Sequence, residues 1–300
     1  MNLSRLKRVV AILIIIVLFY FIGKSLFKNW HSVNAAKLKF NVAYLILSYI
    51  FMYATFLLIA YTWKRSLTII KEHISFLAAL RVNALATLPK YAPGKVWGIL
   101  GKVYLAKKEG ISEHGCVVTI SLETILYLLS GIILFLFTAS SVAKGRIPYT
   151  IYIFLIPICF IIIYPPVLIS ITNFFLRLFK RPLVDFMPNY IQMLELLLLY
   201  TLSWVLQGIG VFFLINSFYH INFKILLTIS GLHAFSWVVG FLSIITPGGL
   251  GVKEGVFSYF ASFLMPAGIA ALVALLVRIW GTIGEVGYFA IFLGKMKKYL

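Results

Sequence analysis

Long apolar segments alternate with short polar ones along the whole chain. Six apolar stretches are each long enough to cross a bilayer, which needs about 20 residues; they cover residues 9–27, 40–63, 115–140, 150–171, 191–218 and 267–293. The polar segments between them are shorter than about 20 residues, whereas a soluble domain needs about 50 or more. The pattern therefore predicts a single all-α integral membrane domain over residues 1–300, with about six transmembrane helices.

Two further apolar regions are interrupted by proline and glycine. The first contains LPKYAPGKVWG at residues 88–98, and the second contains IITPGGLGVKEG at residues 244–255. Proline removes a backbone donor and glycine weakens a helix, so neither region continues as one helix. Backbone without helical hydrogen bonds cannot face lipid and survives only against protein or a water-filled cavity.

These interruptions predict two re-entrant helical hairpins rather than ordinary spans. One hairpin covers residues 76–109, in a first half of the chain that runs from 1 to 149, and the other covers 223–264, in a second half from 150 to 300. Broken helices at corresponding places in two halves are typical of transporters built as inverted repeats. Eight full spans are the alternative.

Composition and charge agree with a membrane protein and argue against nucleic-acid binding. The chain is 62% hydrophobic and 12% charged, and its 27 Lys and Arg residues exceed its 8 Asp and Glu residues. A basic excess suits cytoplasmic loops and anionic lipid, and it comes without a nucleic-acid-binding module. Because basic residues gather at both ends and in the central loop 173–189, we expect both termini in the cytoplasm. The protein is expected in the plasma membrane of a prokaryote.

Each interruption is also a candidate anion site. A half-helix that starts inside a membrane presents free N–H groups and a positive dipole end, and neighbouring cations would strengthen its attraction for a lipid phosphate. Arginine can in addition bind phosphate bidentately. The alternative is that the lysines reach out to the membrane interface and the glycines only serve close helix packing. The predicted head-group residues are Arg81, Lys90, Pro93, Gly94, Lys95, Lys102, Pro247, Gly248, Gly249, Gly251, Lys253 and Arg278.

Three acidic residues fall inside apolar segments, where an unpaired charge costs about 2.5–3.5 kcal/mol. They are Glu123, Glu254 and Glu285. One hypothesis is that these acids pair with Arg278 and Arg81 and release them when a phosphate arrives. A second is that one acid carries a proton and couples transport to the proton gradient. A purely structural ion pair is the third reading.

Enzyme motifs are absent from the sequence. There is no Walker A sequence, no His-Glu-x-x-His pair and no nucleophile elbow. Cys116 and Cys159 are far apart in apolar surroundings, and His233 is a lone histidine in an apolar segment. We therefore predict no catalytic residue, no metal site and no cofactor, and we expect His233 to be a core or proton-relay residue.

The two interrupted motifs resemble the flippase-like transmembrane family that includes the membrane half of the bifunctional lysylphosphatidylglycerol synthases, the multiple peptide resistance factors. The resemblance covers nearly the whole chain. The resemblance implies that, in the bifunctional members, the membrane region moves an aminoacylated lipid between leaflets, while a separate soluble domain transfers lysine from lysyl-tRNA. Because the sequence ends at Leu300, we expect a stand-alone member without the synthase domain and without lysyltransferase activity.

The expected function is therefore translocation of a phosphate-bearing lipid. The candidates are an anionic or aminoacylated phospholipid and a polyprenyl-phosphate carrier. One alternative is a non-transporting subunit that presents lipid to a partner glycosyltransferase or synthase. Another is an integral-membrane lipid-modifying enzyme that uses Glu254 or Glu285 as a base. The expected partners are lipids with anionic head groups and a lipid-modifying enzyme.

Overall fold

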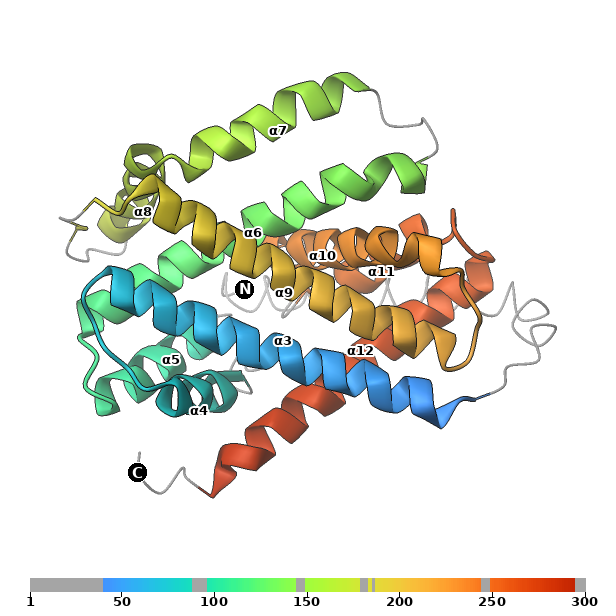
Figure 1. Ribbon diagram of the computed structural model, residues 1–300, viewed down its shortest axis with the longest axis horizontal. Coiled ribbons are helices and arrows are strands. Elements are labelled where there is room, and N and C mark those ends of the chain that lie inside the picture. Colours follow the sequence, from blue (N-terminus) through green and yellow to red (C-terminus); the bar gives the residue numbers. More distant parts are fainter. Residues whose placement is uncertain are drawn as a thin grey trace, which may run out of the picture. The chain divides into compact units, whose positions relative to one another are not determined.

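The computed structural model describes residues 40–87, 96–143, 149–178, 183–184, 187–243 and 249–294. These residues form helices joined by short connections and contain no strand, which confirms the all-α fold (Figure 1). The helices are α3 (Val42–Ile69), α4 (Phe76–Thr87), α5 (Val96–Lys108), α6 (Glu113–Ala143), α7 (Tyr149–Ile163), α8 (Pro165–Leu178), α9 (Tyr190–Asn216), the short 3-10 helix η2 (Phe223–Ile225), α10 (Leu226–Leu242), α11 (Val252–Ala261) and α12 (Ala267–Leu293).

Among the residues that the structure describes, five helical segments have the length and apolar character of membrane spans. Four of them, α3, α6, α9 and α12, coincide with predicted spans. The fifth is η2 together with α10, which has 20 residues and was predicted as one arm of a hairpin. The predicted first span, 9–27, lies outside the described residues.

The predicted span at 150–171 is instead two helices. α7 continues through Pro157, and the chain breaks at Tyr164, so that α7 and α8 meet at 79°. Proline disfavours helical geometry in the residue before it but suits the first turn of a new helix, so Pro165 ends α7 and begins α8. The sequence predicted one span here, whereas the structure has two helices joined at a sharp bend, as in a broken span or a re-entrant loop.

Both predicted hairpins contain two helices that pack against each other. In the first, α4 contacts α5, and in the second, α10 contacts α11 (Figure 1). α4, α5 and α11 have 12, 13 and 10 residues, each fewer than the roughly 20 a span requires. Their entry into and exit from one membrane face stays a prediction.

The contacts within the chain divide it into two compact units. The α10–α11 unit comprises the described residues within 1–52, 134–147 and 204–284, and the α4–α5 unit comprises those within 53–133, 148–203 and 285–300. The long helices α3, α6, α9 and α12 contribute residues to both. Each unit therefore has one hairpin and parts of the same four helices.

Close packing positions the hairpin in each unit. In the α10–α11 unit, Gly208 lies directly against Ser230 of α10, because a side chain at position 208 would overlap that serine. In the α4–α5 unit, the Tyr288 hydroxyl donates to the Leu80 carbonyl of α4 at 3.0 Å. Small residues and buried hydrogen bonds thus hold each hairpin against the long helices.

Candidate functional site

The start of α11 is shaped by two glycines in left-handed backbone geometry. Gly249 has φ of 68° and Gly251, which precedes the first residue of α11, has φ of 79°. A Cβ at Gly249 would lie 2.6 Å from the Gly240 carbonyl oxygen on α10. Only glycine accepts both the geometry and this closeness, so these residues set where α11 begins.

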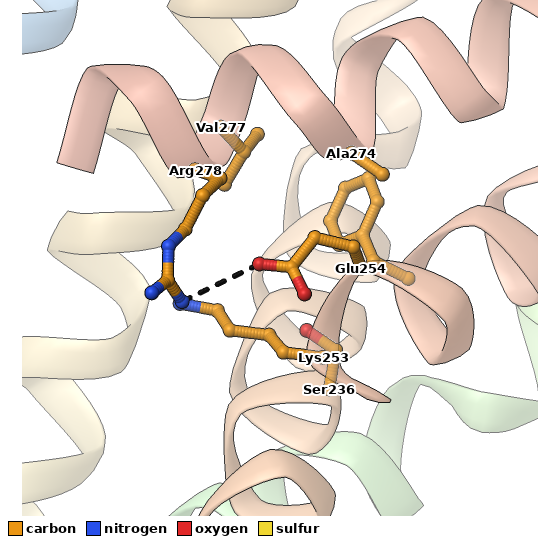
Figure 2. Close-up of a pocket in the computed structure, with 7 residues that line it drawn as sticks. Ser236, Lys253, Glu254, Ala274, Val277 and Arg278 are labelled. Carbon is orange, nitrogen blue, oxygen red and sulfur yellow. Dashed lines mark hydrogen bonds and ion pairs between the residues drawn. The ribbon is translucent and has the colours of Figure 1, made fainter. Parts of the chain in front are cut away.

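Glu254 connects the start of α11 to α12. One carboxylate oxygen accepts a hydrogen bond from the Gly251 backbone N–H at 2.7 Å, as in a capping box. The other lies 3.4 Å from Nη1 of Arg278 (Figure 2). The Glu254 side chain is 1% exposed and that of Arg278 is 21% exposed. The carboxylate is thus a buried anion between a helix N-terminus and a guanidinium.

These two residues share a small cavity with a second cation. Its lining comprises Ser236, Lys253, Glu254, Phe257, Ala274, Val277 and Arg278 (Figure 2). The space is large enough for about one water molecule. In this conformation the cavity is too small for a lipid head group.

A second buried ion pair lies in the α4–α5 unit. Nζ of Lys102 on α5 is 2.6 Å from Oε2 of Glu123 on α6, and it also lies 4.4 Å from the centre of a Trp63 ring. The side chains of Lys102 and Glu123 are 11% and 18% exposed. A cation close to an aromatic face and a carboxylate is stabilised by both. We singled out Lys102 and Glu123 from the sequence separately, and only the structure pairs them.

Arg81 has a different partner from the one suggested by the sequence. It lies 3.4 Å from Glu109, just beyond the end of α5, and its buried Nε has no hydrogen-bond partner in the described part of the chain. Our hypothesis paired Arg81 with an acid inside an apolar span, and Glu109 was not considered. An acid at a helix end gives no signal of its partner, because that partner depends on how α4 and α5 pack.

The remaining predicted residues are Glu285 and six residues that the structure does not describe. Glu285 lies on α12 in the α4–α5 unit, whereas Arg278 belongs to the α10–α11 unit. Trp63, which contacts Lys102, was missed because the sequence marks it only as the end of a span. The predicted residues that lie outside the described ranges are Lys90, Pro93, Gly94, Lys95, Pro247 and Gly248.

Comparison with known proteins identifies the family but no individual relative. Neither the curated proteins nor the solved structures contain a match. The model of the family described as the lysylphosphatidylglycerol synthase TM region matches residues 8–284, which include both interrupted motifs. The chain is therefore a multi-pass membrane protein that belongs to the lysylphosphatidylglycerol synthase TM-region family, as its two motifs predicted.

Proposed function

We propose that this protein translocates a phosphate-bearing lipid between the leaflets of the plasma membrane of a prokaryote, with both of its termini in the cytoplasm. The single observation that carries the proposal is the position of the Glu254 carboxylate. It is held between the Gly251 N–H at the start of α11 and Arg278 of α12, inside a membrane domain.

A lipid phosphate could occupy the same position as this carboxylate. Helix N-termini bind phosphate and carboxylate through the same free N–H groups and the same dipole. Arg278 would add the two-pronged contact that guanidinium makes with phosphate oxygens, and Lys253 lines the same cavity. With two cations and one carboxylate, the cavity has an excess positive charge that matches a singly charged phosphodiester.

The geometry of the Arg278–Glu254 pair favours exchange. The pair is 3.4 Å apart, longer than the roughly 2.7–2.9 Å of a strong charge-assisted hydrogen bond. By contrast, Arg65 holds Glu195 through two hydrogen bonds of 2.8 and 3.0 Å, which clasp α3 to α9. We therefore interpret the Arg65–Glu195 pair as structural and the Arg278–Glu254 pair as open to an incoming anion.

The Lys102–Glu123 pair joins the other hairpin to a long helix. Its charges are reversed with respect to the first pair: α5 of the hairpin provides the cation and the following long helix provides the acid. We interpret this pair, at 2.6 Å, as a contact that holds α5 against α6.

Leaflet exchange in vesicles tests this function. The purified protein is reconstituted into vesicles with phosphatidylglycerol that carries, on an acyl chain, a fluorophore that dithionite bleaches. Dithionite is then added outside the vesicles to bleach the lipids of the outer leaflet. We expect nearly complete bleaching with the wild-type protein and half bleaching in protein-free vesicles. Arg278→Ala should behave as protein-free vesicles do, because the phosphate loses its guanidinium. Arg177→Ala, which removes an exposed arginine from α8, should retain exchange.

The same assay separates the alternatives. Exchange by Arg278→Ala at the wild-type rate contradicts the proposal. Exchange only after a partner is added indicates a lipid-presenting subunit. A changed lipid mass after incubation indicates a lipid-modifying enzyme.

A further inference from the structure

His233 is a buried polar residue that the proposed site does not yet use. It lies on α10 and is 1% exposed. Both ring nitrogens are buried, and neither has a hydrogen-bond partner among the residues that the structure describes. Buried polar groups in native proteins are nearly always satisfied, and an exception calls for an explanation such as an absent ligand.

The histidine contacts one of the residues that line the Arg278 cavity. Its ring is edge-to-face with the ring of Phe257, with centres 6.4 Å apart, and Phe257 lines that cavity. Ser236 is three residues further along α10, so it shares a helix face with His233, and it also lines the cavity. Phe257 thus contacts the imidazole and also lines the space beside Arg278.

The cavity must enlarge to take a head group, and Phe257 is the part of its wall that covers a polar group. Turning the phenyl ring would join the cavity to His233. An uncharged imidazole then offers one N–H donor and one acceptor nitrogen. A hydroxyl group can both accept and donate, whereas an ammonium group only donates and a phosphate oxygen only accepts.

We propose that His233 is a second head-group contact, specific for a hydroxyl group on a phosphodiester lipid whose phosphate binds at Arg278. The inference rests on the proposed function and adds the part of the ligand beyond the phosphate. Phe257 acts as the movable partition between the two contacts.

Two lipids of equal charge test this inference. Phosphatidylglycerol has free hydroxyls beyond its phosphodiester, and phosphatidylmethanol has only a methyl group. Short-chain forms of each are titrated into the solubilised full-length protein by calorimetry. We expect the wild-type protein to bind phosphatidylglycerol about tenfold more tightly, which corresponds to about 1.4 kcal/mol for one buried hydrogen bond.

Substitutions assign that preference to the histidine. His233→Phe should bind both lipids as the wild type binds phosphatidylmethanol, and His233→Gln, which keeps a donor and an acceptor, should regain part of the preference. An unchanged preference in His233→Phe overturns the inference, as does equal binding of the two lipids by the wild type; His233 is then a structural core residue. Arg278→Ala should weaken the binding of both lipids alike. If the substitution weakens the binding of neither lipid, the proposed function itself fails.

Discussion

At the scale of single residues, Glu254 is the anion that the site already contains. One of its oxygens satisfies the N-terminus of α11 and the other faces Arg278, so the carboxylate occupies the place proposed for phosphate. An incoming lipid must compete with it. If the proposed function holds, the charge on Glu254 is expected to favour the closed conformation and to weaken lipid binding.

Neutralising this residue should strengthen binding. Glu254→Gln keeps an oxygen for the Gly251 N–H but removes the charge opposite Arg278, so we expect phosphatidylglycerol to bind about tenfold more tightly, because a contact to a charged group is worth about 1.5–3 kcal/mol. The measurement is a calorimetric titration. Glu113→Gln, at the exposed pair with Lys107, is the control and should leave affinity unchanged. Equal or weaker binding by Glu254→Gln would argue against competition.

At the scale of elements, the turn from α10 into α11 aims the helix N-terminus at the cavity. Gly249 lies against the backbone of Gly240, and Gly251 precedes α11 with its φ of 79°. Gly249 leaves neither room nor torsional freedom for a side chain, and Gly251 has a positive φ that other residues rarely adopt. The backbone geometry thus explains why glycine stands at these two positions, independently of any ligand.

Replacing glycine by alanine should affect stability differently in the turn before α11 and inside α11. Gly249→Ala is expected to lower the free energy of unfolding by about 2 kcal/mol or more, because it forces alanine into left-handed geometry against a carbonyl oxygen. Gly255→Ala, inside α11 with open space around its Cβ, should be neutral or stabilise by up to about 1 kcal/mol. Thermal unfolding in detergent measures both, and similar effects of the two substitutions would contradict the structure.

At the scale of the whole molecule, the helices are those of a protein immersed in lipid. Large apolar side chains remain exposed along the long helices, for example Ile46 of α3, Leu198 of α9 and Ile291 of α12. α9 has 27 residues, which rise about 40 Å and exceed the roughly 30 Å of a hydrocarbon layer. Its two ends are therefore expected on opposite sides of the membrane.

Cysteine labelling tests this orientation. In a protein with Cys116 and Cys159 replaced by alanine, Met187→Cys marks the basic loop before α9, and His220→Cys marks the connection after it; both positions are exposed. The basic loop favours the cytoplasm, so a membrane-impermeant maleimide applied to intact cells should label position 220 and not 187. Labelling of position 187 alone would reverse the topology, and labelling of both would show that α9 does not span.

The lengths of the apolar segments were enough to predict four of the spans, because a bilayer imposes its thickness on every helix that crosses it. The proline and glycine interruptions predicted the paired helices within 76–109 and 223–264, and the two motifs predicted the family. Charged residues within those segments were also recognisable, since charges in lipid need partners. The sequence did not reveal which charged residues pair with each other. Lys102 contacts Glu123 and Trp63, and Arg81 contacts Glu109, because the packing of helices decides which residues far apart in sequence meet. Likewise, only the folded chain brings His233 against Phe257 and places the Glu254 carboxylate at the start of α11. Both contacts depend on the geometry of the packed helices, which the composition of the sequence does not reveal.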